Sequence, residues 1–238
     1  MPWPVLVFDI ESIPDIAGLR QLRDAPPEVT DQQLWAAWQQ ERKDAGQSDF
    51  MPLYLQRILV ISCVFRNAEG LRVHSFVDRD NASEGKVIQT FFNTLEKHVP
   101  QLVSWNGGGF DLPVLHYRGL RHGVVASKYW DLGDDDREFK FNNYIGRYHS
   151  RHCDLMDLLA LYQPRNNVPL DDLAESSLAT HRRTLRFDIQ ASGDQFIATP
   201  RIVIEPASTT IVSIGCCITL GLSSDSYEWY RMNPPIAT

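Results

Sequence analysis

The chain has 238 residues, of which 43% are hydrophobic and 22% charged, and its formal net charge is −7. This size and composition predict a soluble globular protein with a full hydrophobic core, and the negative charge excludes a general electrostatic surface for nucleic acid while leaving an enzyme with a local substrate groove open. The four cysteines form no C-x-x-C pair and no segment has the pattern of a signal peptide or a membrane span, so we expect a cytoplasmic protein with no membrane partner.

The first predicted element is a buried strand over residues 5–12, with the sequence VLVFDIES. In an extended chain Asp9 and Glu11 share one side, while Ile10 turns into the core. Two carboxylates at the end of a buried strand are costly unless a cation lies between them, and Mg²⁺ or Mn²⁺ suits oxygen ligands of this kind. The alternative is that Asp9 caps a loop and Glu11 is solvated.

Residues 14–50 leave the predicted sheet and form a helical insertion. Its helix runs over about residues 30–45, with Thr30 as a possible N-cap. Trp35 and Trp38 either stack on bases or anchor the helix by packing.

The next elements alternate between strands and helices, which predicts an α/β domain. They are strands over 57–65 and 71–77 joined as a hairpin, a helix over 84–98, a strand over 101–105, and a helix over 112–122 with Val114, Leu115 and Leu120 facing inward.

A second acidic motif, NGGGFD over residues 106–111, follows the strand over 101–105. Three consecutive glycines allow tight backbone geometry, including positive φ at no steric cost. Asp111 is therefore expected on a turn between a strand and a helix, near the helix N-terminus.

A mixture of basic and aromatic residues lies beyond an irregular segment that contains a solvated acidic loop. Such a mixture could hold phosphates and stack a single strand, and structural use of several members is the equal alternative. The candidate substrate contacts in it are Lys140, Tyr144, Arg147 and Arg151. Asp154, shortly after it, is expected to cap a helix, with an approach to a metal site as the alternative.

Taken together, FDIES and NGGGFD resemble the first two exonuclease motifs of the DEDD superfamily, specifically those of the exonuclease domain of family B DNA polymerases and its stand-alone bacterial relatives. The stretches FMPLYLQRILVISCVF and YHSRHCDLMDLL extend the resemblance over residues 3 to about 174. It implies a ribonuclease-H-like α/β fold, with a mixed sheet flanked by helices.

The resemblance also implies a function, a metal-dependent 3′-to-5′ exonuclease that hydrolyses terminal phosphodiester bonds of single-stranded nucleic acid with a free 3′ end. Asp9, Glu11 and Asp111 would hold two Mg²⁺ or Mn²⁺ ions. Ile10, Asn106 and Phe110 are the implied substrate contacts next to them. The alternatives are a catalytically inactive nucleic-acid-binding module of the same fold and a ribonuclease-H-like nuclease that cuts at internal sites.

The tail over residues 175–238 departs from the resemblance, so residues 1–174 are the predicted exonuclease-like domain. A helix with the pattern Tyr-x-x-x-Asp should follow after about residue 190, but the tail contains β-like segments instead. Three explanations follow: a change of reading frame near residue 175, a divergent tail in which Asp188 or Asp194 supplies the missing acid, or a loss of catalysis with binding retained.

Overall fold

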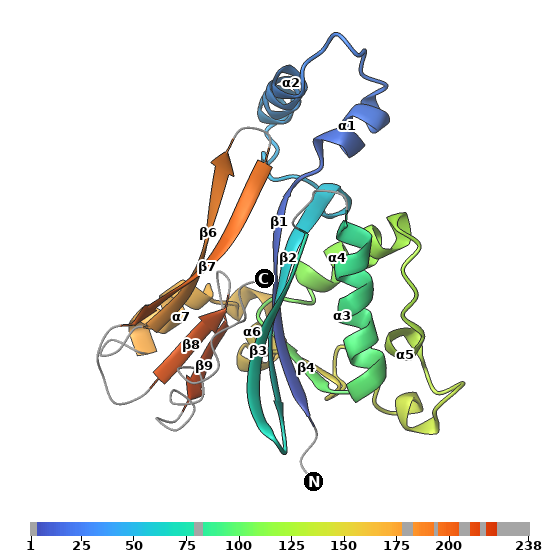
Figure 1. Cartoon of the computed structure of the whole chain (residues 1–238), viewed down its shortest axis with the longest axis vertical. Coiled ribbons are helices and arrows are strands. Elements are labelled where there is room, and N and C mark those ends of the chain that lie inside the picture. Colours follow the sequence, from blue (N-terminus) through green and yellow to red (C-terminus); the bar gives the residue numbers. More distant parts are fainter. Residues whose placement is uncertain are drawn as a thin grey trace.

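The computed structural model describes the backbone of residues 4–78, 83–177, 183–192, 195–204, 210–214 and 218–222, and the side chains of residues 4–78 and 83–173. Its centre is a five-stranded mixed sheet in the order β3-β2-β1-β4-β5 (Figure 1). The strands are β1 Val5–Pro14, β2 Gln56–Asn67, β3 Gly70–Val77, β4 Gln101–Ser104 and β5 His152–Asp154.

The sheet is antiparallel on one side of β1 and parallel on the other. Strands β1, β2 and β3 form the antiparallel part, which includes the predicted hairpin, whereas β4 and β5 run parallel to β1. The ladder between β1 and β4 ends at the pair Val7 and Val103, so β4 does not pair with the last part of β1.

Helices cover one face of this sheet, and α3 and α4 lie against it (Figure 1). The helices are α1 Ile16–Arg23, α2 Asp31–Asp44, α3 Glu84–His98, α4 Asp111–Arg121, α5 Ser127–Trp130, α6 Leu155–Leu159 and α7 Leu170–Ser177, with 3₁₀ turns η1 Leu53–Leu55, η2 Arg137–Lys140 and η3 Pro164–Asn166. None of the helices in the described part of the chain is long and apolar enough to cross a membrane. The arrangement confirms the predicted ribonuclease-H-like α/β fold.

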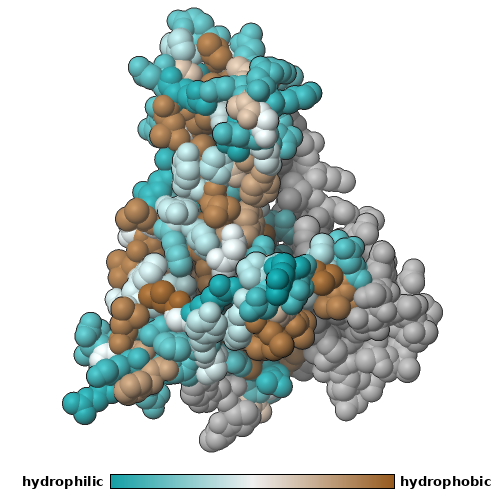
Figure 2. All heavy atoms as spheres, turned by 180° about the vertical axis from the view of Figure 1, so that it is seen from behind, coloured by the Kyte–Doolittle hydropathy of each residue, from teal (hydrophilic) through white to brown (hydrophobic). Residues whose placement is uncertain are grey.

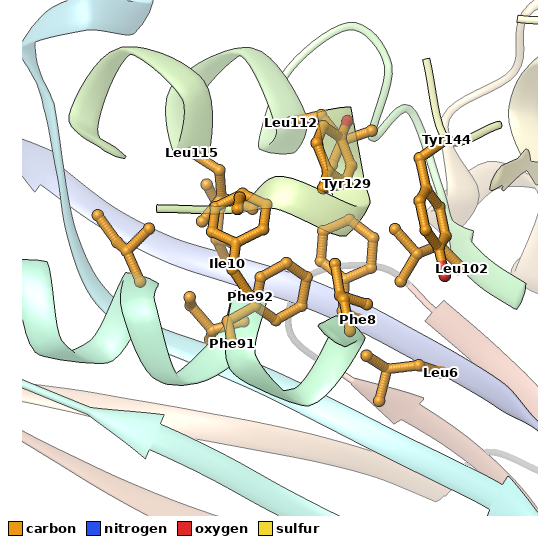
Figure 3. Close-up of a cluster of buried hydrophobic side chains, with 14 of the residues drawn as sticks. Leu6, Phe8, Ile10, Phe91, Phe92, Leu102, Leu112, Leu115, Tyr129 and Tyr144 are labelled. Atoms are coloured by element: carbon orange, nitrogen blue, oxygen red, sulfur yellow. The ribbon is translucent and has the colours of Figure 1, made fainter. Parts of the chain in front are cut away.

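The main core lies between the sheet and the helices α3 and α4 (Figure 3). Leu6, Phe8 and Ile10 of β1 point into it, whereas Val7 belongs to a small cluster on the opposite face. Because side chains alternate along a strand, Asp9 and Glu11 lie on the same face of the sheet as Val7. The two acids therefore share one side of the strand, as predicted.

The helical insertion has a small core of its own, which consists of Leu19, Leu34, Trp38, Met51 and Leu55. Thr30 caps α2 in a capping box with Gln33, which confirms the predicted helix start. Trp38 is buried, and the ring of Trp35 stacks on it at 5.1 Å. The insertion is therefore anchored by Trp38.

A buried ion-pair network joins α4 to the end of β1 and to α3. Arg118 is only 2% exposed and binds Asp15 and Glu84, each at 2.6 Å. Glu84 also accepts the backbone N–H of Ile58 at 2.8 Å. Arg118 therefore faces the interior from α4. The prediction that Leu120 faces inward is wrong, because Leu120 is 82% exposed.

The chain after Ser177 contains strands in its described residues, which confirms the predicted β character of the tail. They are β6 Arg183–Ser192, β7 Gln195–Ile204, β8 Thr210–Ile214 and β9 Ile218–Leu222, in the sheet order β7-β6-β8-β9. Among the described residues after Ser177 there is no helix. Asp188 lies in β6, whereas Asp194 lies outside the described residues.

Candidate active site

The end of β1 carries the first two candidate acids. Asp9 and Glu11 are both partly buried, and a β-bulge between Glu11 and Ser12 interrupts the pairing with β2 directly after them. Bulges re-aim side chains at the end of a ladder. The acids therefore lie where β1 leaves the regular sheet.

Asp111 begins α4 and lies against the same end of β1. Its Oδ1 accepts the backbone N–H of Ile10 at 3.1 Å, and its side chain is only 3% exposed. A hydrogen bond also joins its carboxyl to that of Asp9. The fold therefore brings together two acids that the sequence separates by about a hundred residues. The contact is possible because β4 stops pairing with β1 at Val7 and does not occupy the edge of β1 at Ile10.

The glycine turn before Asp111 is tight because two of its glycines have no room for a side chain. A Cβ on Gly107 would overlap the hydroxyl of Ser104, and a Cβ on Gly109 would overlap the amide of Asn106. The left-handed residue of the turn is Asn106, with φ of 59°, rather than a glycine. The glycines are thus required for space and not for positive φ, which asparagine tolerates.

Asp154 holds this turn from the neighbouring strand β5. Its two carboxylate oxygens accept the backbone N–H groups of Asn106 and Gly108, each at 2.9 Å. It also accepts the N–H of Met156 at 3.2 Å, which confirms the predicted helix cap. The contacts of Asp154 with the turn could not be predicted from the sequence, since nothing in the spacing shows that β5 lies next to β4.

Burial controls the electrostatics of the acids. Desolvation raises the pKa of Asp111 to about 7, although the hydrogen bonds from Ile10 and Asp9 act in the opposite direction, and the nearby charge of Asp154 raises it further. Burial also raises the pKa of Glu11. A carboxylate in such a place is stabilised by a proton or by a bound cation.

This acid set has the donor chemistry of a divalent cation site. Two carboxyl groups in contact, one buried and one partly buried, offer oxygen atoms of the kind that Mg²⁺ and Mn²⁺ prefer. Within the described residues, no group of three or more His, Cys, Asp or Glu side chains is arranged to hold a metal ion. The contact of Asp9 with Asp111 brings two carboxyl groups together, and Glu11 follows Asp9 on the same strand.

The three candidate contacts next to the acids differ in their exposure. The side chain of Ile10 is buried in the core, so its backbone N–H is the group that faces the acids. Asn106 is partly buried in the glycine turn. Phe110 is half-buried at the start of α4, and its ring lies 5.8 Å from that of Phe50.

The basic and aromatic set around residue 147 is divided between the core and the surface. Tyr144 is buried, and its hydroxyl donates to the carbonyl of Pro100 at 2.7 Å. Arg151 is buried over the ring of Phe139 at 4.2 Å. Their burial favours the structural alternative for both residues.

The two exposed members of this set are Lys140 and Arg147. Arg147 forms a bidentate ion pair with Asp157, at 2.8 and 2.9 Å. Lys140 lies 5.7 Å from the ring centre of Phe141. These are therefore the side chains of the set that face solvent.

Comparison with known proteins identifies one family. The model of the family described as predicted 3′-5′ exonuclease related to the exonuclease domain of PolB matches residues 48–179 of the 238. The match includes the glycine turn, Asp111 and Asp154, and it begins after β1. No curated protein is significantly similar to the chain.

Proposed function

Because the chain belongs to the family of predicted 3′-5′ exonucleases related to the exonuclease domain of PolB, we propose that it is a metal-dependent 3′-to-5′ exonuclease acting on single-stranded nucleic acid. The observation that carries this proposal is the contact of Asp111 with Asp9 and with the N–H of Ile10. It joins the two acidic motifs at one point of the fold. We also propose that the exonuclease-like domain spans residues 1–174, with the insertion at about residues 14–50 and a separate tail over 175–238.

Asp9, Glu11 and Asp111 would hold one or two Mg²⁺ or Mn²⁺ ions. Such ions supply an activated water at neutral pH and stabilise the leaving 3′ oxygen of a phosphodiester. The protein contributes the ligand positions, because the N–H of Ile10 fixes one oxygen of Asp111 and the Asp154 carboxylate holds the turn that precedes it. Glu11 would lie beside the 3′ hydroxyl of the terminal nucleotide.

The terminal nucleotide would lie over Phe110 and the Asn106 turn, next to the acids. Partly buried aromatic rings stack on unpaired bases, which favours a single strand over a duplex. Lys140 and Arg147 are proposed as further phosphate contacts, because both reach solvent. The product would be a nucleoside 5′-monophosphate released from a 3′ end.

The direct test is digestion of a 5′-labelled single-stranded oligonucleotide in the presence of Mn²⁺. The proposal predicts a ladder that shortens from the 3′ end and disappears with EDTA and with Asp9→Ala. The matched control is Asp136→Ala, which removes a surface acid paired with Lys128 and should leave the ladder unchanged. Cleavage of a circular single strand would instead indicate an internal nuclease, and an unchanged ladder with Asp9→Ala would refute the assigned site.

A second candidate function is a catalytically inactive module that binds nucleic acid. It is favoured by the tail, whose described residues form strands where the resemblance predicts a helix with a fourth acid. Binding of a single strand that persists in EDTA, together with no hydrolysis by a folded protein, would select this candidate.

A further inference from the structure

Four aromatic residues form a row of rings that begins beside Asp111 and follows α4 away from the acids. The row consists of Phe50, Phe110, Tyr54 and Tyr117, and we call it the aromatic track. Each of its two pairs joins the segment around η1 to α4. The rings of Phe50 and Phe110 lie 5.8 Å apart, and those of Tyr54 and Tyr117 lie 6.4 Å apart, nearly perpendicular at 83°.

The track is exposed because the residues next to it are anchored in the interior. Met51 and Leu55 are buried in the insertion core, which turns Phe50 and Tyr54 outward. On α4, the neighbouring Arg118 is fixed in the buried ion-pair network and also donates to the carbonyl of Tyr54, at 3.4 Å.

Three rings of the track are half-exposed or more. Phe50 is 55% exposed, and Tyr54 and Tyr117 are each 50% exposed. Hydrophobic residues are visible among the hydrophilic ones on the surface of the described chain (Figure 2). What distinguishes the track from scattered apolar residues is that its rings are paired and that Phe110 directly precedes Asp111 in the chain.

The spacing of the two pairs suits a polynucleotide. Phe110 and Tyr117 are separated by seven positions of the sequence, which corresponds to about 10 Å along a helix. At about 3.4 Å or more for each nucleotide, this separation covers two or three nucleotides. Arg121, one turn beyond Tyr117, is exposed and donates to the uncharged side chain of Gln21 at 3.3 Å, so a guanidinium lies at the far end for a backbone phosphate.

We propose that the aromatic track binds unpaired bases located two or three nucleotides back from the 3′ end, by stacking and without preference for base sequence. The inference rests on the proposed exonuclease function and adds to it Phe50, Tyr54 and Tyr117, which lie outside the acidic motifs. Stacking requires free base faces, and bases in a duplex have none, so the track selects single strands.

The test separates binding from hydrolysis. In EDTA, the wild-type protein is titrated into a 5′-fluorescein-labelled decanucleotide, as a single strand and as a duplex, and fluorescence anisotropy reports the affinity. The double variant Tyr54→Leu/Tyr117→Leu keeps apolar bulk without rings, and Tyr54→Phe/Tyr117→Phe keeps the rings without hydroxyls. The control Leu120→Ala removes an exposed apolar side chain from α4 outside the track.

The expected result is single-strand affinity that falls about tenfold or more in the leucine variant and is retained in the phenylalanine variant and the control. Hydrolysis of the p-nitrophenyl ester of thymidine 5′-monophosphate in Mn²⁺, which contains one nucleotide and no strand, should be unchanged in all three. Equal affinities of the leucine variant and the wild type for the single strand, or preference for the duplex, would refute the proposal that the aromatic track binds unpaired bases. Single-strand binding that depends on the rings, without any hydrolysis, would support base binding by the aromatic track and refute the proposed exonuclease function.

Discussion

The backbone N–H of Ile10 donates to Oδ1 of Asp111 at 3.1 Å, across 101 positions of the sequence. This bond is available because β4 stops pairing with β1 at Val7, which frees the amide of Ile10 for another acceptor. A buried amide without a partner is costly, so the contact stabilises the fold and also sets the position of a candidate metal ligand. The two acidic motifs are thus joined by the same bond that closes the end of the sheet.

The pKa of Asp111 predicts how stability depends on pH. Because burial raises this pKa from 3.8 to about 7, the folded state binds more protons than the unfolded state between these values. The contribution of Asp111 to the free energy of unfolding in EDTA should therefore fall as the pH rises from about 4 to about 7, by an amount on the order of a few kcal/mol, and level off above that range.

The variant Asp111→Asn isolates this contribution. Its amide oxygen can still accept the N–H of Ile10, but the amide does not titrate. The free energy of unfolding of the variant should therefore increase relative to that of the wild type as the pH rises from about 4 to about 7. Urea unfolding at several pH values measures the difference. Parallel stability curves for the two proteins would show that Asp111 titrates normally.

Divalent cations should stabilise the protein through the same acids. Above the raised pKa of Asp111, Mn²⁺ replaces a proton as the partner of its carboxylate, so the melting temperature at pH 8 should rise when Mn²⁺ is added in excess of its Kd. Asp9→Ala and Asp111→Asn should each abolish most of this rise. Asp157→Asn, which changes an acid paired with Arg147, serves as the control and should keep it.

Removal of the Asp154 carboxylate should loosen the glycine turn. Asp154→Asn keeps the size of the side chain but replaces one oxygen acceptor with an amide donor, so one of the two turn N–H groups loses its partner. We expect a loss of about 1–3 kcal/mol in the free energy of unfolding and a clear fall in nuclease activity. Denaturant titration and the oligonucleotide assay measure the two effects, and unchanged values in both would contradict the role assigned to Asp154.

Gly107 should not tolerate a methyl group. The Cβ of Gly107→Ala would overlap the hydroxyl of Ser104, which is hydrogen-bonded to His152 at 2.8 Å and therefore cannot move freely. Overpacking of this kind costs about 1–3 kcal/mol. Gly123→Ala is a poor control because its φ is positive, so the comparison is the double variant Gly107→Ala/Ser104→Gly, which should recover part of the lost stability by restoring space.

The buried arginine offers a test of the network that joins β1 to α4. Arg118→Met leaves Asp15 and Glu84 buried without their arginine, and Glu84 keeps only the contact with His122, so the free energy of unfolding should fall by about 3–5 kcal/mol. Arg121→Met, on the exposed side of the same helix, should change it by less than about 0.5 kcal/mol. Equal effects of the two substitutions would mean that the network does not hold these elements together.

Patterns along the chain were enough to predict most elements of the sheet domain. Alternation in 5–12 placed Ile10 in the core and the acids on the other side, and Thr30 marked the start of α2. Leu120 was misassigned because apolar spacing alone cannot show that an inward position of α4 belongs to an arginine with two buried acidic partners. The family resemblance, now confirmed over residues 48–179, also came from short motifs.

The sequence by itself determined which acids exist, the order of the strands along the chain, and the turn that carries Asp111. Only the tertiary structure decided which groups meet: Asp111 with the amide of Ile10, Asp154 with the turn, and Tyr144 with the core instead of the surface. The physical reason is that motifs report local backbone preference and periodicity, whereas these contacts depend on where β4 stops and on which strand lies beside it. Those are properties of the assembled sheet, set by packing between segments far apart in the chain.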